Sequence, residues 1–552
     1  MYRLCPGTSS RFGVITLLLL SAVGTAGAQA PSPGTVGDTL KRAPELQAPA
    51  SAPPVQRDEA PAPPVSASAT RFVVSAFVFE GNTLFSAGQL APIVAGYLGR
   101  PITLVEVYAA ADLVAEHYVA SGYSLVSVNV PPQKIADGSV RLQVSEGRLA
   151  KVTTEGNQMY STEQLVSRLE GVSAGSVYRG TALERSLREL NTLPGLQVRA
   201  VVRPGEAYGT SDLVLRATER RYEGAATVDN YGRDTIGEIR YSISGKINNP
   251  FRLADQIQLM ALRSESGLLT YGYGAYSLPI NRQGTRLTAS YGHAEFEVEN
   301  SPVDGKNRSG RLNLEHPLIR SAEESLSASI GVSTIDANSD FSGLPLNDTL
   351  VTVLELGALY SYSHPQIGLT QVSSQIATNF QKLTRDEINA AQFFGERLFG
   401  DQRLRLEVDL QQLTPLAAGL QLRGHVNAVY SPDPLVDTQQ YSLGGPNSVR
   451  GFLSSEIRGD RGYFGSVTLQ RPMAVGALRL TPRIFADAGK VFVVDADPGV
   501  SDEESLTSVG IGLDLQYQRL GAKFDWSFPT DGHIASDGED DSRFYGSLSA
   551  SF

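Results

Sequence analysis

FYGSLSASF, residues 544–552, ends the chain with a strict two-residue alternation. One face of this segment is apolar or small, and the other carries Tyr545 and three serines. AKFDWSFP, residues 522–529, repeats the pattern, with aromatic rings on one face and Lys523, Asp525 and Ser527 on the other. A period of two residues predicts β-strands, because successive strand side chains point to opposite sides.

The polar face of these strands indicates a barrel in a membrane. Charged and small residues opposite apolar ones are typical of strands whose polar side chains line a lumen and whose apolar side chains meet lipid. The pattern continues back to about residue 219, and at roughly 10 residues per strand plus connections it allows some 14 to 18 strands. We therefore predict a transmembrane antiparallel β-barrel of about 16 strands over residues 219–552. A soluble β-sandwich is the alternative that the pattern leaves open.

Loop lengths predict the orientation of the barrel. The turn Arg519–Gly521 is short, as periplasmic turns are, whereas Thr530–Ser542 and Val494–Ser505 are long and acidic, as extracellular loops are. Counting back from these, the segment between strands expected at Leu422–Tyr430 and Tyr463–Gln470 is an extracellular loop of about thirty residues.

The N-terminus has the pattern of a secretory signal peptide over residues 1–28. Arg3 and Arg11 supply positive charge, Val14–Val23 is a short apolar core, and Ala26-Gly27-Ala28 offers a cleavage site. The alternative is a membrane anchor, but the apolar run is too short to span a bilayer. Cys5 is the only cysteine, so the mature chain would have none, which excludes disulfides, thiol catalysis and cysteine-based metal sites.

Residues 29–70 are rich in proline, alanine and serine, which predicts an extended linker without a core. Within this linker, Val36–Leu46 could make two or three helical turns, but its pattern is weak and disorder is expected.

Two small α+β modules follow the linker, at residues 71–147 and 148–218. Each is predicted to begin with a strand, to continue with two helices and to end with two further strands. Both carry Glu-Gly-Asn directly after the first strand, at residues 80–82 and 155–157. This internal repeat indicates duplication of one module.

Composition and motifs argue against several classes of function. A net charge of −11 and a pI near 5.2 argue against a nucleic-acid partner. The six histidines are scattered without an H-E-x-x-H motif, and no phosphate-binding loop is present. The acidic clusters Asp502–Glu504 and Asp537–Asp541 lack the spacing of a calcium loop. We therefore expect no enzyme, no cofactor and no metal site.

Two strings in the barrel region suggest a contact between a loop and the wall: SLGGPNSVRGF at 442–452 and FADAG at 485–489. Arg450 lies in the glycine-bracketed extracellular loop. Asp487 lies on the charged face of the strand expected at Leu478–Ala488, which must turn to the lumen because a lipid-facing arginine or lysine at the bilayer midplane costs about 2–4 kcal/mol, and an aspartate somewhat less. A bidentate ion pair between the two would anchor the loop inside the barrel. The residues alone leave open that Arg450 simply lies in solvent.

These two strings resemble the paired signatures of the outer-membrane assembly and secretion superfamily, and the two modules resemble POTRA domains. GYSLVSVNVPPQKIADGSVRLQVSEGRL, residues 122–149, is similar to the first POTRA domain of two-partner secretion transporters of the haemolysin-activator type. The resemblance covers nearly all of residues 71–552. It implies that Arg450, on a long sixth loop, meets Asp487, on strand 13 of a 16-stranded barrel, as a lock. It also implies that the surroundings of this lock are shaped by Val449, Gly451, Phe452, Phe485 and Gly489.

The resemblance further implies an outer-membrane pore that recognises a large secreted protein through periplasmic POTRA domains and exports it. That partner would be an adhesin, a cytolysin or a contact-dependent toxin. Outer-membrane lipid and the barrel assembly machinery, through the C-terminal strand ending at Phe552, are further expected partners. Such transporters often carry an N-terminal helix that plugs the pore; Val36–Leu46 is short and polar for that role, which argues against a plug helix but leaves its existence open.

Three alternatives remain beside export. The first is an assembly factor of the same superfamily that inserts other barrels, against which the presence of two modules and the VPPQ string speak. A passive porin would not need periplasmic modules, and a barrel lipase would need a serine–histidine arrangement that the sequence does not contain.

Overall fold

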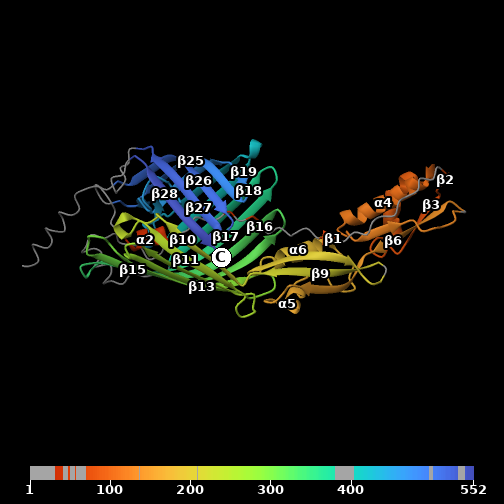
Figure 1. Cartoon of the computed structure of the whole chain (residues 1–552), viewed down its shortest axis with the longest axis horizontal. Coiled ribbons are helices and arrows are strands. Elements are labelled where there is room, and N and C mark those ends of the chain that lie inside the picture. Colours follow the sequence, from red (N-terminus) through yellow and green to blue (C-terminus); the bar gives the residue numbers. More distant parts are fainter. Residues whose placement is uncertain are drawn as a thin grey trace, which may run out of the picture.

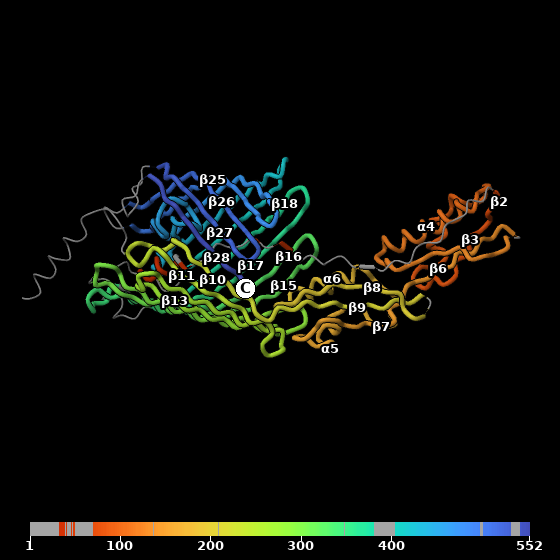
Figure 2. The backbone as a smooth tube through the Cα atoms, in the orientation of Figure 1, coloured from red at the N-terminus to blue at the C-terminus, as the bar shows by residue number. Residues whose placement is uncertain are grey.

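The computed structural model describes residues 32–40, 46, 48–49, 56–57, 70–135, 137–207, 209–379, 403–496, 501–531 and 541–552. The molecule is elongated: a β-barrel forms one end, and two small modules extend from it in a row (Figure 1). Figure 2 shows the chain passing from the second module directly into the barrel wall. The signal peptide expected at residues 1–28 lies outside the described residues.

The barrel is closed and antiparallel. Each strand pairs with its neighbours in the sequence, and the last strand pairs with the first. The described strands are β10 (Tyr222–Asp229), β11 (Arg240–Asn248), β12 (Gln256–Ser264), β13 (Leu269–Pro279), β14 (Arg286–Glu297), β15 (Val303–Arg320), β16 (Glu324–Phe341), β17 (Leu344–His364), β18 (Gly368–Asn379), β19 (Leu404–Pro415), β20 (Gln421–Tyr430), β23 (Arg461–Gln470), β24 (Met473–Val475), β25 (Leu478–Phe492), β26 (Glu503–Tyr517), β27 (Leu520–Pro529) and β28 (Arg543–Ser551).

These seventeen labels amount to sixteen barrel strands in the described chain. β23 and β24 pair with the same partner, β25, in one continuous register, since Gln470 faces Arg483 and Met473 faces Leu480. Between them lies Arg471-Pro472, and proline has no N–H to donate to a ladder. β23 and β24 are therefore one strand interrupted at a proline, and the predicted barrel of about 16 strands is confirmed.

The two faces of the wall differ as the alternation predicted. On β25, Arg483, Phe485 and Asp487 are buried, whereas Ile484 is 56% exposed. Large apolar side chains are similarly exposed around the whole wall, among them Leu259, Leu312, Val467, Trp526 and Leu548. Charge inward and apolar surface outward is the arrangement of a barrel in lipid, and it excludes the soluble sandwich.

The first module contains β2 (Arg71–Val73), β3 (Ala76–Glu80), α3 (Ala87–Val94), η1 (Ala95–Tyr97), β4 (Pro101–Thr103), α4 (Leu104–Ala120), β5 (Val126–Asn129) and β6 (Ser139–Glu146). Helices and sheet enclose a core that includes Leu90, Val114 and Leu142. Prolines after β5 end its backbone ladder with β6. The side chain of Gln133 then supplies the next hydrogen bonds to β6. Its amide nitrogen donates to the Arg141 carbonyl at 2.9 Å, and its oxygen accepts the Arg141 N–H at 2.7 Å.

The second module contains β7 (Arg148–Glu155), α5 (Thr162–Val166), α6 (Gly180–Leu190), β8 (Leu196–Pro204) and β9 (Thr210–Glu219). Its sheet has the order β1-β8-β9-β7. The extra strand, β1 (Gln56–Arg57), comes from the expected linker and pairs in parallel with Val201 and Val202 of β8. One part of the linker is thus held against the second module. None of the described helices is long and apolar enough to cross a membrane.

The Glu-Gly-Asn repeat forms the same turn in both modules. Its glycines have φ of +83° and +80°, a left-handed conformation that glycine adopts readily. Asn82 and Asn157 each donate a side-chain hydrogen bond to the carbonyl three residues later, at 2.8 and 2.9 Å. In each module a glutamate of the last strand accepts backbone N–H groups from the residues after this turn, Glu146 in the first and Glu219 in the second. This shared architecture supports duplication.

One helix was not expected. α2 (Pro33–Thr39) lies inside the barrel, where it contacts β14, β15 and β16. The sequence favoured disorder over helical turns for Val36–Leu46 and left a plug helix open; for residues 36–39, which the structure describes as helical, the expected disorder is wrong. The helix starts earlier because Ser32 and Thr35 cap each other's backbone N–H groups and Pro33 occupies the first helical position.

Candidate functional site

The loop between β20 and β23 returns into the barrel. It carries a short hairpin of β21 (Tyr441–Leu443) and β22 (Ile457–Gly459), which lies against β23, β25 and β26. The hairpin presents a loop tip, residues 444–456. At its first residue, Gly444, φ is +107° and an added Cβ would lie 2.3 Å from the Leu453 carbonyl oxygen. Only glycine satisfies both the backbone conformation and the available space.

Arg450 and Asp487 form a bidentate ion pair. Arg450 Nε donates to Asp487 Oδ2 at 2.7 Å, Nη2 donates to Oδ1 at 2.7 Å, and the backbone N–H donates to Oδ2 at 3.2 Å. The Arg450 side chain is 9% exposed and that of Asp487 is fully buried. The fork of a guanidinium fixes both distance and orientation. The structure thus brings together the two residues that the sequence placed on the loop and on the wall.

Three of the residues expected around this pair pack directly on it or beside it. The Phe485 ring lies against the guanidinium, with Arg450 Cζ 3.3 Å from the ring centroid, a cation–π arrangement. Val449 and Phe452, on either side of Arg450 in the chain, are fully buried in one apolar cluster. The charged tip is therefore enclosed by apolar side chains.

Two glycines make room for this packing. Gly451 has a φ of +104°, so the chain can turn directly after Arg450. Gly489 lies two residues after Asp487, and a Cβ there would be 2.6 Å from Leu443 Cδ1. Both expected glycines therefore lie in the site, one shaping the tip and the other admitting the β21–β22 hairpin against β25.

Two polar residues of the site were not identified from the sequence. Ser466 bridges the ion pair, since its Oγ donates to Asp487 Oδ1 at 2.6 Å and accepts from Arg450 Nη2 at 3.2 Å. Asp525 lies 3.9 Å from Arg450 Nη1. Alternation places both on the lumen side, but only strand register shows that Ser466 faces Asp487 across β23 and β25.

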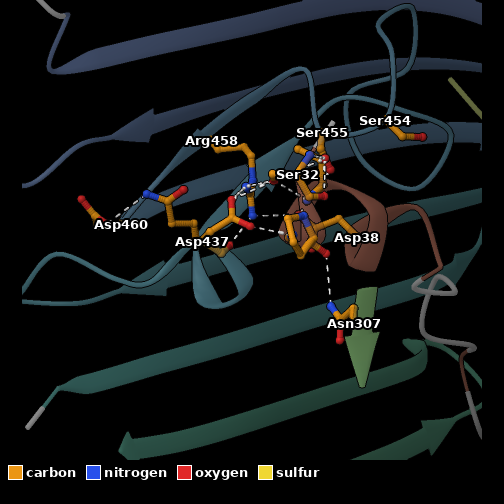
Figure 3. A network of polar contacts seen from close by, with 12 residues as sticks. Ser32, Asp38, Asn307, Asp437, Ser454, Ser455, Arg458 and Asp460 are labelled. Carbon is orange, nitrogen blue, oxygen red and sulfur yellow. Dashed lines mark hydrogen bonds and ion pairs between the residues drawn. The ribbon is translucent and has the colours of Figure 1, made fainter. Parts of the chain in front are cut away.

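Helix α2 is attached to the same loop (Figure 3). Ser32 Oγ donates to Asp437 Oδ1 at 2.9 Å, and the Gly34 N–H donates to Oδ2 at 2.6 Å; Asp437 belongs to η4 (Asp437–Gln439). Arg458 of β22 pairs with Asp437 and lies 3.6 Å from Asp38 Oδ2. A Cβ at Gly34 would lie 2.4 Å from Asp437 Oδ2, so this contact also requires glycine.

The barrel wall holds α2 as well. Val36 is fully buried in a cluster with Leu269 and Phe296 of the wall. Asn307 of β15 donates to the Pro33 carbonyl at 3.1 Å (Figure 3). The helix is thus held between the loop and the wall.

Two polar cavities adjoin the loop tip in the lumen, with volumes of about 480 and 530 Å³. Pro446, Asn447 and Ser448 of the tip line both cavities. Charged side chains line each of them, among them Asp38 and Glu407 in the first and Arg423 and Arg479 in the second. In the described part of the chain, no group of three or more His, Cys, Asp or Glu side chains is arranged to hold a metal ion.

Comparison with known proteins identifies the family that this chain matches. Residues 209–515, more than half of the chain, match the family described as haemolysin secretion/activation protein ShlB/FhaC/HecB, and residues 72–147 match the POTRA domain, ShlB-type. The chain is 26% identical to the hemolysin transporter protein ShlB of Serratia marcescens, over 84% of this chain and 82% of that protein. It is 23% identical to the heme/hemopexin transporter protein HuxB of Haemophilus influenzae (strain 86-028NP), over 79% and 78%.

A solved structure shares the fold. CdiB from Escherichia coli superposes with a TM-score of 0.68 at 20% sequence identity, covering 95% of this chain and 100% of that chain. The prediction of a two-partner secretion transporter, made from the loop, wall and module motifs, is confirmed by the family match. The chain therefore belongs to the haemolysin secretion/activation protein (ShlB/FhaC/HecB) family, as an outer-membrane transporter of the two-partner secretion type with periplasmic POTRA domains.

Proposed function

We propose that the chain exports one large secreted protein through the barrel, and that the loop tip and α2 close the lumen until this partner arrives. The observation that carries the proposal is the position of the tip, whose residues Pro446, Asn447 and Ser448 line two separate polar cavities. Withdrawal of the tip would join these cavities into one water-lined path. No bond is made or broken in this process.

The Arg450–Asp487 pair is the lock of this closed state. The pair is almost fully buried, and removal of one partner from such a pair is strongly unfavourable because the other charge stays buried without compensation. The loop therefore remains in place unless another interaction replaces the pair. A polar, extended substrate segment in the lumen supplies groups that could do so.

The POTRA domains would recognise the partner by strand addition. An extended peptide adds to an exposed sheet edge through backbone hydrogen bonds. In the first module the sheet order β3-β6-β5 leaves β3 and β5 at the edges, and in the second β7 is at the edge opposite β1. The chain itself offers a precedent, since β1 already adds to β8 in this way.

The partner class is a large exoprotein, such as an adhesin, a cytolysin or a contact-dependent toxin. The apolar outer wall would contact outer-membrane lipid, and the C-terminal strand ending at Phe552 would be recognised by the barrel assembly machinery. Folding of the emerging partner outside the cell would give direction, because a folded product cannot return through the pore.

A deletion strain tests export against barrel assembly. We expect the culture medium to lose one large exoprotein, encoded beside this gene, while porins in the outer membrane stay at their normal level. Expression of the intact chain from a plasmid should restore secretion. A general loss of porins would instead indicate an assembly factor of the same superfamily and would overturn the proposal.

A further inference from the structure

The barrel has a seam where its first and last strands meet. β10 and β28 are registered over five residue pairs, from Ala225–Ser551 to Asp229–Ser547, whereas every other pair of neighbouring wall strands in the described chain is registered over at least eight, with β23 and β24 counted as one. At the extracellular end, the Asn230 side chain continues the contact, with hydrogen bonds of 2.8 and 2.7 Å to the backbone of Phe544 and Gly546. The seam is the shortest ladder of the wall.

On the β28 side of the seam, Tyr545 holds the loop tip. Its hydroxyl accepts the Gly451 N–H at 3.2 Å and donates to the Phe452 carbonyl. Tyr545 is 3% exposed, so water does not readily replace it as the partner of these two backbone groups. The two residues that it holds directly follow Arg450.

On the β10 side, Arg233 and Tyr231 hold the same tip. Arg233 Nη1 donates to the Ser454 carbonyl at 2.7 Å and to the Ser455 carbonyl at 3.4 Å, and Ser454 Oγ donates to the Tyr231 carbonyl at 3.3 Å. Arg233 is buried. The rings of Tyr231 and Tyr545 meet edge to face from the two sides of the seam, with centroids 6.1 Å apart. Residues 451–455 therefore span the seam.

We propose that residues 451–455 form a clasp that closes the β10–β28 seam, and that Tyr545 and Arg233 are the positioning residues that attach it. The β10–β28 ladder remains the shortest of the described wall even with the backbone hydrogen bonds of Gly224–Phe552 and Asn230–Gly546 at its two ends, and the clasp adds contacts to both of its sides. Because Gly451 follows Arg450 directly, any movement that separates Arg450 from Asp487 also pulls on the clasp. The lock and the wall are thereby coupled. This coupling is a property of the resting barrel and does not depend on which protein is exported.

The first test is amide hydrogen exchange of the full-length protein in detergent, read on peptides. We expect Tyr545→Phe to speed exchange at least tenfold for amides that pair across β10 and β28, while those between β25 and β26 keep the rate of the parent protein. Tyr241→Phe, which removes a hydroxyl from the exposed face of β11, is the matched control. Arg233→Met removes the other attachment and should give the same pattern, even if Tyr545→Phe does not fold.

The second test is rescue by a disulfide across the seam. Thr227 and Ser549 face each other. Gly224 and Phe552 exchange both backbone hydrogen bonds, at 3.0 and 2.9 Å, so by alternation Thr227 and Ser549 form a non-hydrogen-bonded pair, whose Cα atoms are only about 4.5 Å apart, within disulfide range. The one native cysteine, Cys5, lies in the expected signal peptide. In the Tyr545→Phe protein, oxidised Thr227→Cys/Ser549→Cys should restore seam exchange to within twofold of the parent.

A disulfide elsewhere in the wall is the control for rescue. Ser244→Cys/Met260→Cys joins β11 to β12 and should leave the fast seam exchange of Tyr545→Phe unchanged. Seam exchange that stays at the parent rate in both Tyr545→Phe and Arg233→Met would overturn the proposal. Equally faster amide exchange between β25 and β26 would also overturn it, and so would rescue by both disulfides. Either result would mean that Tyr545 contributes generally to the stability of the barrel.

Discussion

Two segments of the chain occupy the lumen, and they are held very differently. The loop tip is joined to the wall at both ends and inserts a bidentate ion pair whose aspartate is fully buried. α2 has seven residues and is held by a polar network around Asp437 and by one buried valine, Val36. Removing one partner of a buried ion pair costs about 3–5 kcal/mol, whereas burial of one valine side chain contributes about 1.5–3 kcal/mol.

This difference indicates an order of release. We expect the helix to leave the lumen first and the loop to follow. A helix of two turns is not stable alone in water, so α2 is helical only while it is docked. The following predictions test this contrast.

The largest effect is expected at the lock. Arg450→Ala leaves Asp487 buried without its partner, so we expect at least a tenfold loss of secreted partner protein at normal outer-membrane levels of the transporter. Arg450→Lys should remain defective, because an ammonium group cannot form the fork. Arg479→Ala removes another lumen-facing arginine from β25 and serves as the control. Full export by Arg450→Ala would refute the role of the lock.

A smaller effect is expected from a methyl group at the start of α2. Gly34→Ala places a Cβ 2.4 Å from Asp437 Oδ2, whereas the same change at Gly37 meets only the Asn307 side chain, at 3.4 Å. Alanine favours helix over glycine by about 1 kcal/mol at either position. We therefore expect Gly34→Ala to raise single-channel conductance in planar bilayers several-fold, and Gly37→Ala to leave it at or below the parent value. Equal conductance in the two variants would contradict the docking contact.

The apolar side of α2 should matter less. Val36→Thr keeps the shape of the side chain and puts a hydroxyl into the buried cluster with Leu269 and Phe296, at a cost of about 1–3 kcal/mol. We expect more frequent openings of the channel, but fewer than with Gly34→Ala. Combined with Gly34→Ala, the substitution should add little, because the helix has already left. Additive effects would indicate that Val36 acts outside the docked helix.

The smallest effect concerns the first POTRA domain and pH. Burial would raise the pKa of Glu146, but hydrogen bonds from the Thr83 hydroxyl and from the Leu84 and Thr83 N–H groups outweigh burial and lower this pKa. The ionised carboxylate therefore stabilises the folded domain. This contribution is fully present above the ordinary glutamate pKa of about 4.3 and is lost as the pH falls through the lowered pKa of the folded state.

Glu146→Gln should accordingly lower the free energy of unfolding of the first POTRA domain by about 1–2 kcal/mol at pH 7, and the difference should shrink below about pH 4. Urea unfolding of the full-length protein, followed by the circular dichroism of the module helices, measures it. Glu219→Gln changes the equivalent residue of the second module. This control should leave the unfolding of the first POTRA domain by urea unchanged. If Glu146→Gln lowered the free energy of unfolding by the same amount at pH 3 as at pH 7, the charge of Glu146 would not be the cause.

The loop and the barrel could be predicted from the sequence because their signals are local or repeated. Two-residue alternation recurs in strand after strand. Each strand that shows it strengthens the prediction of a barrel from the others. Arg450 is bracketed by glycines, and Asp487 lies on the only face of its strand where charge is tolerated. The family resemblance then supplied the pairing of the two, which alternation alone left undecided.

The helix, the seam contacts and β1 could not be predicted in this way. α2 is capped by Ser32 and Thr35, where a glutamate or glutamine at the second position would be the usual signal. Its main polar partner, Asp437, is 403 residues away from Gly34 in the sequence. Likewise Tyr545 faces the lumen by alternation, but its contact with Gly451 depends on how a loop 94 residues earlier folds back. Such contacts exist only in the assembled barrel.

The pairing of β1 with β8 sets a limit on the travel of α2. Leu40, at the end of the helix, and Gln56 of β1 are sixteen positions apart in the sequence. A fully extended chain of that length spans at most roughly 55 Å, more than the ~30 Å thickness of the hydrocarbon core. Because β1 pairs with β8, this length is the farthest that α2 can travel from the second POTRA domain. We expect a helix that has left the lumen to remain near the pore mouth, at an effective concentration on the order of millimolar, and to close the channel again once the cargo has passed.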